Sequence, residues 1–338
     1  MTKIGKQTWG YTKPVYIQST GTAVGPLEGQ GPLKDTFDKV YNELHCNEDN
    51  WELAERRLML EAVNQSLQKA GVDQRNIDLF LAGDLLNQNV TGNYVARHLG
   101  IPLIGMFGAC STSMETLATG AALISGGYAK QAIAAVSSHN ATAERQFRYP
   151  TEYGGQKPNT ATYTVTGSGA ALLSSKPSAV KIEAATIGKV MDYGITDPFD
   201  MGSAMAPAAW DTIKTHLEDM GRVPGDYDVI ATGDLSAVGS PIVRDMLKDD
   251  GYNIAEVHKD CGLLIYHSEQ PVFSGGSGCA CSAVVTYGKL LNGLKDGTYK
   301  RILVVATGAL MSPMMLQQKE SIPGIAHAVV LAKEEGYE

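Results

Sequence analysis

An internal duplication constrains the fold of this 338-residue chain more than any other feature. Seven segments occur in the same order in both halves, at an offset of roughly 150 to 170 residues. Chance similarity between small apolar residues could produce one such match, but hardly seven. The matched segments are 14–24 and 180–190, 51–71 and 203–221, 76–84 and 227–235, 92–100 and 240–251, 108–127 and 279–297, 131–139 and 300–309, and 166–175 and 325–334.

The repeated segments alternate between the patterns of strands and helices. Residues 51–71 form an amphipathic helical pattern that ends at Gly71, and residues 131–139 read as a buried strand. Such alternation predicts an α/β fold with parallel-rich sheets covered on both faces, in which the two central helices pack together. We place the domain boundary so that residues 1–178 and 179–338 form the two halves. The polar residues 140–165 are expected to be turn-rich.

Composition and charge exclude several classes of function. The net charge of −8 argues against nucleic acid as a partner, because phosphate binding needs a basic surface. We find no pattern of a signal peptide and no apolar run long enough for a transmembrane helix. The five cysteines are sparse and odd in number, which does not suit a disulfide framework. Cys279 and Cys281 lack further ligands at suitable spacing, so no metal site is predicted.

A lone cysteine, Cys110, precedes the central helical pattern of the first half. Ser111 and Thr112 are good first residues for a helix, which places the thiol at a helix N-terminus. That position lowers a thiol pKa and favours a nucleophile, but its free N–H groups also bind anions. The strand-end loops that should share a cleft with Cys110 contain Asp84, His139, Asp234 and residues 274–278 and 307–312.

The sequence resembles the thiolase superfamily over about residues 14–334. The motifs that carry this resemblance are GACSTS, with Cys110 before a Gly/Ala-rich helix, and TGSGAALLSS at 166–175. The resemblance implies a five-layer αβαβα fold made of two duplicated halves, and a homodimer whose contact we assign to the strand 131–139. It also implies a cysteine that accepts an acyl group from a thioester with the help of His or Asn residues from the second half.

The catalytic partners expected from this resemblance are absent. Gly233 stands near the position of the histidine, and Ser277 stands where the second partner, Asn or His, is expected. Losing a general base costs about 10²–10⁴-fold in rate, so the anion-binding role of Cys110 is favoured. The alternative is an acyltransferase or ketoacyl-synthase-like enzyme that uses Cys110 as acyl acceptor, with a base moved to a residue such as His258.

A more particular resemblance is to a family of non-catalytic, thiolase-like sporulation proteins, in stretches such as GDLLNQNVTGNYVARHLG and TATYTVTGSGAALLSS. It implies binding of dipicolinic acid or its calcium chelate, uptake of this ligand into the developing spore, and membrane proteins of the same operon as partners. A cytoplasmic protein peripheral to the forespore inner membrane follows, with no cofactor except calcium carried by the ligand. The residues that we expect to contact the ligand are Asp84, Cys110, Ser111, Ser277, Thr307 and Ser312.

Two of these expectations remain open at the level of sequence. Asp84 would repel a free dianion and suits a calcium-bound ligand, or it caps a neighbouring backbone loop. Arg145 and Arg148 are the best cationic candidates for an acidic ligand, or they form a solvated loop face.

Overall fold

The computed structural model describes residues 2–147 and 156–337. Within them, each half has a five-stranded unit with the same strand order, and the two units join through antiparallel pairing of their first strands. The order in the first half is β5 (Leu103–Gly105), β4 (Leu79–Gly83), β6 (Gln131–Ser138), β8 (Gly167–Ser174) and β2 (Thr8–Val24). The second half follows with β11 (His258–Asp260), β10 (Val229–Thr232), β13 (Arg301–Ala309), β14 (Gly324–Lys333) and β9 (Val180–Ile187).

The pairing directions confirm the duplication predicted from the sequence. The strands of each half are numbered here in chain order. In both halves the second strand runs parallel to the third and fourth, and the fifth strand runs antiparallel to the fourth and the first. The boundary that we placed at 178/179 falls just before β9.

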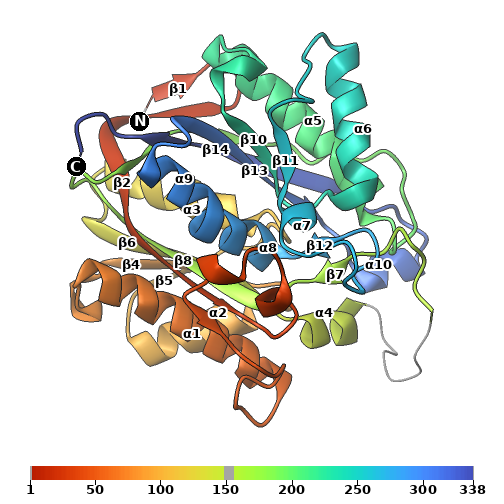
Figure 1. The fold of residues 1–338 in the computed structure, drawn as a ribbon, viewed down its shortest axis with the longest axis horizontal. Helices are drawn as coiled ribbons and strands as arrows, with labels where there is room; N and C mark the ends of the chain where they lie inside the picture. Colours follow the sequence, from red (N-terminus) through yellow and green to blue (C-terminus); the bar gives the residue numbers. More distant parts are fainter. Residues whose placement is uncertain (1, 148–155, 338) are drawn as a thin grey trace.

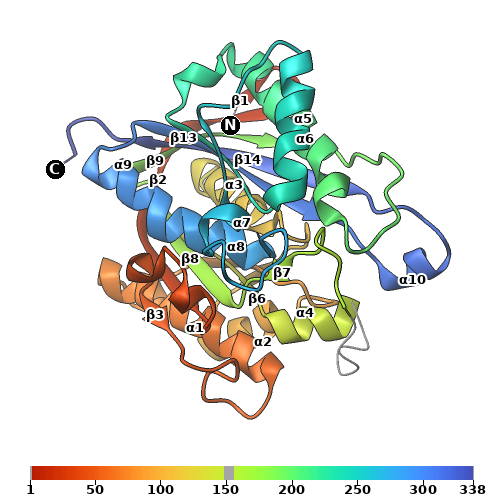
Figure 2. The ribbon, with the colours of Figure 1, turned by 45° about the vertical axis from the view of Figure 1, so that its right-hand side comes forward.

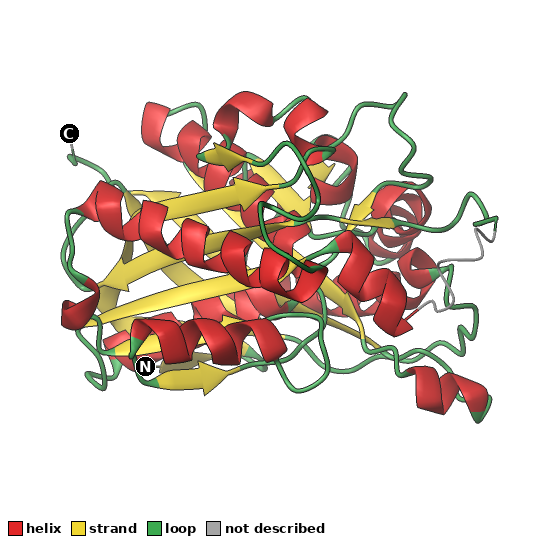
Figure 3. Cartoon of the chain, turned by 90° about the horizontal axis from the view of Figure 1, so that it is seen from below, coloured by secondary structure: helices red, strands yellow, loops and turns green. Residues whose placement is uncertain are grey.

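Helices form three layers around and between the strands (Figures 1 and 2). The central helix α3 (Thr112–Ser125) contacts strands of both halves and packs against α8 (Cys279–Val284), as the sequence predicted. Figure 1 shows the strands between these helical layers, which together make a five-layer αβαβα architecture. In Figure 3, seen from below, helices lie in front of the strands. One outer layer holds α1 (Trp51–Ala70) and α2 (Val90–Leu99), the other α5 (Met201–Met220) and α6 (Ser236–Asp249), and the centre α3 (Thr112–Ser125), α8 (Cys279–Val284), a π-helical turn (Val285–Leu290) and α9 (Leu291–Asp296).

The equivalent helices α1 and α5 begin and end in the same way. The side chains of Asn50 and Asp200 each accept a hydrogen bond from the backbone N–H three residues later, which satisfies a free donor of the first turn. Gly71 and Gly221 end the two helices in the left-handed conformation, which glycine adopts without steric cost.

Two expectations from the sequence are wrong. Residues 140–147, expected to be turn-rich, form the helix α4 (Asn140–Phe147), whose first turn is held by the ring of His139, which accepts from the backbone N–H of Ala141. The strand 131–139, assigned as a dimer edge, is β6 in the interior of the sheet, because β4 and β8 occupy both of its sides. The ladder of the two halves ends instead at β5 and at β11.

Short elements complete the described chain. The strands β7 (Tyr163–Thr164) and β12 (Gly276–Ser277) pair with each other and join the two halves beside the central helices. None of the helices in residues 2–147 and 156–337 combines the length and apolar character that a membrane span needs. The short elements are β1 (Thr2–Ile4), β3 (Lys39–Val40), β7 (Tyr163–Thr164), β12 (Gly276–Ser277), α7 (Cys261–Leu264), α10 (Pro313–Gln317) and the 3₁₀ turns Glu28–Gln30, Lys34–Thr36, Gln74–Asn76 and Pro224–Asp226.

Candidate functional site

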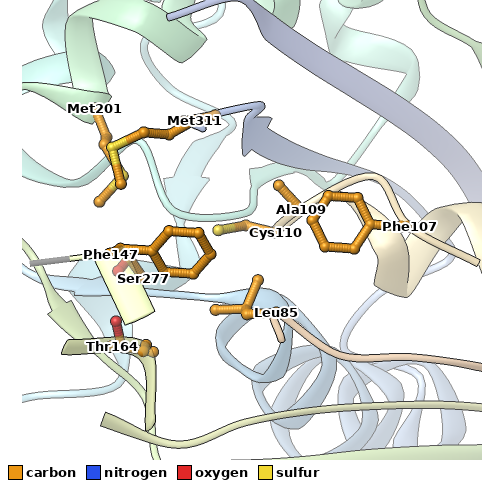
Figure 4. A pocket seen from close by; sticks show the side chains of 11 residues that line it. Leu85, Phe107, Ala109, Cys110, Phe147, Thr164, Met201, Ser277 and Met311 are labelled. Atoms are coloured by element: carbon orange, nitrogen blue, oxygen red, sulfur yellow. The ribbon is translucent and has the colours of Figure 1, made fainter. Parts of the chain in front are cut away.

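A pocket opens at the strand ends where the two halves meet, and Cys110 lies in its wall. The empty space between its side chains, including the mouth, is about 470 Å³. In Figure 4 the ring of Phe147 and the side chain of Leu85 lie beside the sulfur of Cys110, and Met201 and Met311 lie on the opposite side from Leu85. The lining residues are Leu85, Phe107, Ala109, Cys110, Ala143, Phe147, Thr164, Met201, Ser277, Ala309 and Met311.

The loop that carries Cys110 is tightly held. Ala109 has a positive φ of 50°, which is uncommon outside glycine and turns the chain sharply before the helix. The hydroxyl of Ser111 donates to the carbonyl oxygen of Gly108 over 2.6 Å, and that of Thr112 donates to the carbonyl oxygen of Ala109 over 2.7 Å. Helix α3 therefore starts at Thr112, two residues after Cys110.

The electrostatic surroundings of Cys110 differ from the expectation. The sequence predicted a lowered thiol pKa, but burial raises the pKa of Cys110 well above its usual value, and the carboxylate of Asp234 raises it further. Cys110 is hydrogen-bonded to Asp234, which stabilises the thiol against ionisation. The lowered pKa expected from the helix start is therefore wrong, because burial and a neighbouring carboxylate outweigh the helix N-terminus.

Asp234 also belongs to this site, although it was not among the residues predicted to contact the ligand. Its two carboxylate oxygens accept from the hydroxyl of Thr307 over 2.6 Å and from the backbone N–H of Gly278 over 2.9 Å. Burial raises the pKa of Asp234 to about 7. The internal duplication could have identified Asp234 in the sequence, because Asp234 is the counterpart of Asp84 at a strand end.

The pocket walls are mainly apolar, and sequence reasoning missed them. Among the described residues that line the pocket, no side chain carries a formal charge. Phe107 comes from the segment after β5, Phe147 from α4, Met201 from α5 and Met311 from the segment after β13. Nothing in the local sequence marks these four residues, because they come together only through the packing of the two halves.

The six predicted ligand contacts do not all meet at the pocket. Ser277 lines it together with Cys110, and its hydroxyl accepts from that of Thr162 over 3.0 Å. Ser111 and Thr307 are fully buried behind the wall in the hydrogen bonds already described. Ser312 precedes α10 and is not part of the lining.

Asp84 occupies a capping position, which is one of the two roles left open by the sequence. Its carboxylate oxygens accept from the backbone N–H groups of Leu86 over 3.0 Å and of Gly92 over 2.9 Å. Asp84 is fully buried and lies outside the pocket lining. It therefore fixes the start of α2.

Of the two basic candidates, Arg145 is not among the described residues that line the pocket. Arg145 forms an ion pair with Glu52 and places its guanidinium 5.5 Å from the centre of the Trp51 ring. Arg148 lies outside the described residues. Over residues 2–147 and 156–337, no group of three or more His, Cys, Asp or Glu side chains is arranged to hold a metal ion.

Comparison with known proteins decides the family. A sequence model of the stage V sporulation protein AD family matches residues 5–332. The stage V sporulation protein AD of Bacillus subtilis (strain 168) is 65% identical over 332 residues, which is 98% of each chain. The chain belongs to the stage V sporulation protein AD family. This membership supports a role in sporulation.

Solved structures show the same fold at low sequence identity. 3-Oxoacyl-[acyl-carrier-protein] synthase III from Aquifex aeolicus VF5 has a TM-score of 0.58 at 13% identity, over 94% of this chain and 99% of that one. Human mitochondrial 3-ketoacyl-CoA thiolase, solved with CoA, has a TM-score of 0.57 at 12% identity, over 97% of this chain and all of that one. At this identity the likeness establishes the thiolase-like fold and nothing about activity.

Proposed function

We propose that this member of the sporulation family binds dipicolinic acid, carried as its calcium chelate, in the Cys110 pocket and supports its uptake into the developing spore. The observation that carries the proposal is the pocket itself. It is formed by both halves, its described lining has no charged side chain, and burial together with the charge of Asp234 keeps its cysteine as a neutral thiol.

The chemistry of the lining favours the chelate over the free dianion. Dipicolinate is a flat pyridine ring with two carboxylates, so its faces suit the apolar side chains of Leu85, Phe107 and Phe147. Ser277 and Thr164 can donate hydroxyl hydrogen bonds to a carboxylate. A free dianion would lose its hydration without a cation to replace it, whereas calcium neutralises the ligand before it enters.

Calorimetry with dipicolinate alone, calcium alone and the two together tests this proposal. Binding of the mixture is expected to be tighter than binding of either component. Phe107→Ala removes one apolar wall and should weaken binding by about tenfold, the loss of roughly 1–2 kcal/mol of buried ring surface. Tyr337→Ala is the matched control, because Tyr337 and Phe107 are 45% and 46% exposed but Tyr337 lies in the C-terminal tail. Absence of heat and of a thermal shift at millimolar ligand would refute the proposal.

The competing function is acyl transfer at Cys110, which the retained cysteine motivates. We propose that the protein is not an enzyme, because the thiol pKa is raised and the described lining contains neither His nor Asn, the catalytic partners that the thiolase resemblance implies. His258, the base considered from the sequence, is buried and bonded to the hydroxyl of Thr232 over 2.9 Å. Mass spectrometry after incubation with acyl-thioesters distinguishes the two functions. A mass gain that Cys110→Ala abolishes would establish acyl transfer.

We further propose a homodimer that pairs along the free edge strand β5 instead of β6. Ile104 on this strand is 38% exposed, and Phe107 beside it also lines the pocket. A dimer along this edge would therefore cover the flank of the pocket. Light scattering should give twice the chain mass, and Ile104→Lys should give monomers, because a charge would be buried without a partner. A monomeric wild-type protein would contradict this interface.

The remaining part of the proposal concerns the membrane. We propose that the protein acts at the forespore inner membrane as a peripheral partner of membrane proteins from the same operon. Fractionation of sporulating cells, with and without those membrane proteins, tests this placement. Recovery in the soluble fraction in both cases would contradict it.

A further inference from the structure

A groove lies between the outer helices α1 and α2, apart from the Cys110 pocket. It consists of two adjoining hollows of about 690 and 640 Å³ that share Arg56 and Tyr94 in their walls. Leu60 and Val95 provide apolar surface in the second hollow. None of the residues lining this groove lines the Cys110 pocket.

The groove concentrates basic side chains in a protein of net charge −8. Arg57, Arg97 and His98 line the second hollow together with Arg56. Two carboxylates also contribute to the walls, Glu48 in the second hollow and Glu52 in the first.

Neither carboxylate neutralises Arg56 or Arg97. Glu52 forms an ion pair with Arg145, and the negative charge of Glu48 favours the charged form of Arg57. Over residues 2–147 and 156–337, neither Arg56 nor Arg97 has an ion-pair partner within 4 Å.

Two arginines of the second half have the carboxylate partner that Arg56 and Arg97 lack. Arg222 and Arg301 both bind the carboxylate of Glu183. Arginines without a carboxylate partner in one groove repel each other, and an anion bound between them would remove that cost.

One of the two free arginines is already positioned. The guanidinium of Arg97 lies 4.6 Å from the centre of the Tyr94 ring, an arrangement that stabilises the cation and limits its freedom. Tyr94 is 45% exposed, so the stacked pair remains open to a ligand. Because a guanidinium offers a planar fork of donors, two arginines can hold several oxygens of one tetrahedral anion.

We propose that the α1–α2 groove is a binding site for a phosphate group, held by Arg56 and Arg97. The group belongs either to a soluble phosphate compound or to a lipid headgroup, and both present the same oxygens to the two guanidinium groups. The site is independent of the ligand proposed for the Cys110 pocket.

The experiment compares two probes with the full chain at low salt. Inorganic pyrophosphate is titrated by calorimetry, and vesicles of phosphatidylglycerol and phosphatidylcholine are compared with pure phosphatidylcholine vesicles in a flotation assay. Each lost arginine contact should weaken binding by about tenfold, the size of one charge-assisted hydrogen bond. The double variant Arg56→Gln, Arg97→Gln should therefore lose detectable binding. Arg75→Gln is the matched control, because Arg75 is an exposed arginine paired with Asp73 outside the groove.

Each outcome decides the proposal. If the wild-type protein and Arg75→Gln bind pyrophosphate and the double variant does not, the result supports a soluble phosphate ligand. If the same difference between the proteins is found with anionic vesicles and not with pyrophosphate, it supports a lipid headgroup. No binding of either probe by the wild-type protein overturns the proposal, as does equal binding by the wild-type protein and the double variant. Thermal unfolding of the double variant, expected to match the wild type, establishes that any loss is local.

Discussion

The hydroxyl groups of Ser113 and Ser282 lie 2.6 Å apart in the buried contact between α3 and α8. These two helices occupy equivalent places in the duplicated halves, and both side chains are inaccessible to solvent. The centre of the molecule therefore contains a polar link between halves, inside a core that is otherwise rich in alanine.

We predict that the two hydroxyl groups act as a pair. Ser113→Ala or Ser282→Ala alone should lower the free energy of unfolding by about 1–2 kcal/mol, because each leaves the other hydroxyl buried with its partner gone. The double variant should cost about as much as one single variant. Urea unfolding of all four proteins measures this coupling, and additive costs would show that the pair is not a unit.

Gly308 is predicted to be essential for the Cys110 loop. A Cβ at this position would collide with the carbonyl oxygen of Gly108 and approach the backbone nitrogens of Ser111 and Cys110. Gly308→Ala should therefore destabilise the protein by about 1–3 kcal/mol, the usual cost of overpacking. Thermal unfolding measures this, with Gly225→Ala as the control, because no atom lies within 4 Å of a Cβ built there. An unchanged melting temperature for Gly308→Ala would contradict the close approach.

The order of the strands and central helices was predictable from the sequence, since duplication and apolar periodicity report directly on repeated, buried elements. The interior place of β6 was not predictable, because a continuous apolar run is the same for any buried strand. Helix α4 was missed because Asn140–Phe147 is short and mostly polar and depends on His139 for its first turn.

The candidate site was likewise predictable only in part. Cys110 and Ser277 could be found from their neighbours in sequence, and the structure brings both to one pocket. The hydrogen bond of Cys110 to Asp234 depends on packing between the halves, so the raised thiol pKa could not be anticipated from the helix start alone.

We predict that Asp234 suppresses the reactivity of Cys110. In Asp234→Asn the negative charge that raises the thiol pKa is gone, so the pKa falls and the thiolate fraction at a given pH rises. Alkylation of Cys110 by iodoacetamide at pH 8 should become about tenfold faster, equal to one unit of pKa. Peptide mapping assigns the modified cysteine, and Asp49→Asn, which changes an exposed aspartate, should leave the rate unchanged. Equal rates in both variants would refute the role of Asp234.

Buried carboxyl groups should make the stability of the protein fall as pH rises. The carboxylate of Glu55 accepts from the hydroxyls of Ser137 over 2.9 Å and Thr142 over 2.8 Å, but burial and the charge of Asp84 still raise its pKa to about 8. In the unfolded chain the pKa of a glutamate is about 4.3. Between these values the native state binds more protons than the unfolded state, so stability is present below the unfolded pKa and lost as pH rises through the folded pKa.

We therefore predict that the free energy of unfolding decreases between pH 6 and pH 8.5 and that Glu55→Gln makes this decrease shallower. The amide cannot ionise and can still meet the two hydroxyl partners of Glu55, so the penalty of a buried charge disappears at high pH. Urea unfolding at several pH values measures the slope, with Glu43→Gln as the exposed control. Burial lowers the pKa of His216, His258 and His327 to about 4. These histidines therefore lower the stability only as the pH falls into the acid range, which is opposite in direction to the effect of Glu55. An identical slope in wild type and Glu55→Gln would show that Glu55 is already ionised at pH 6.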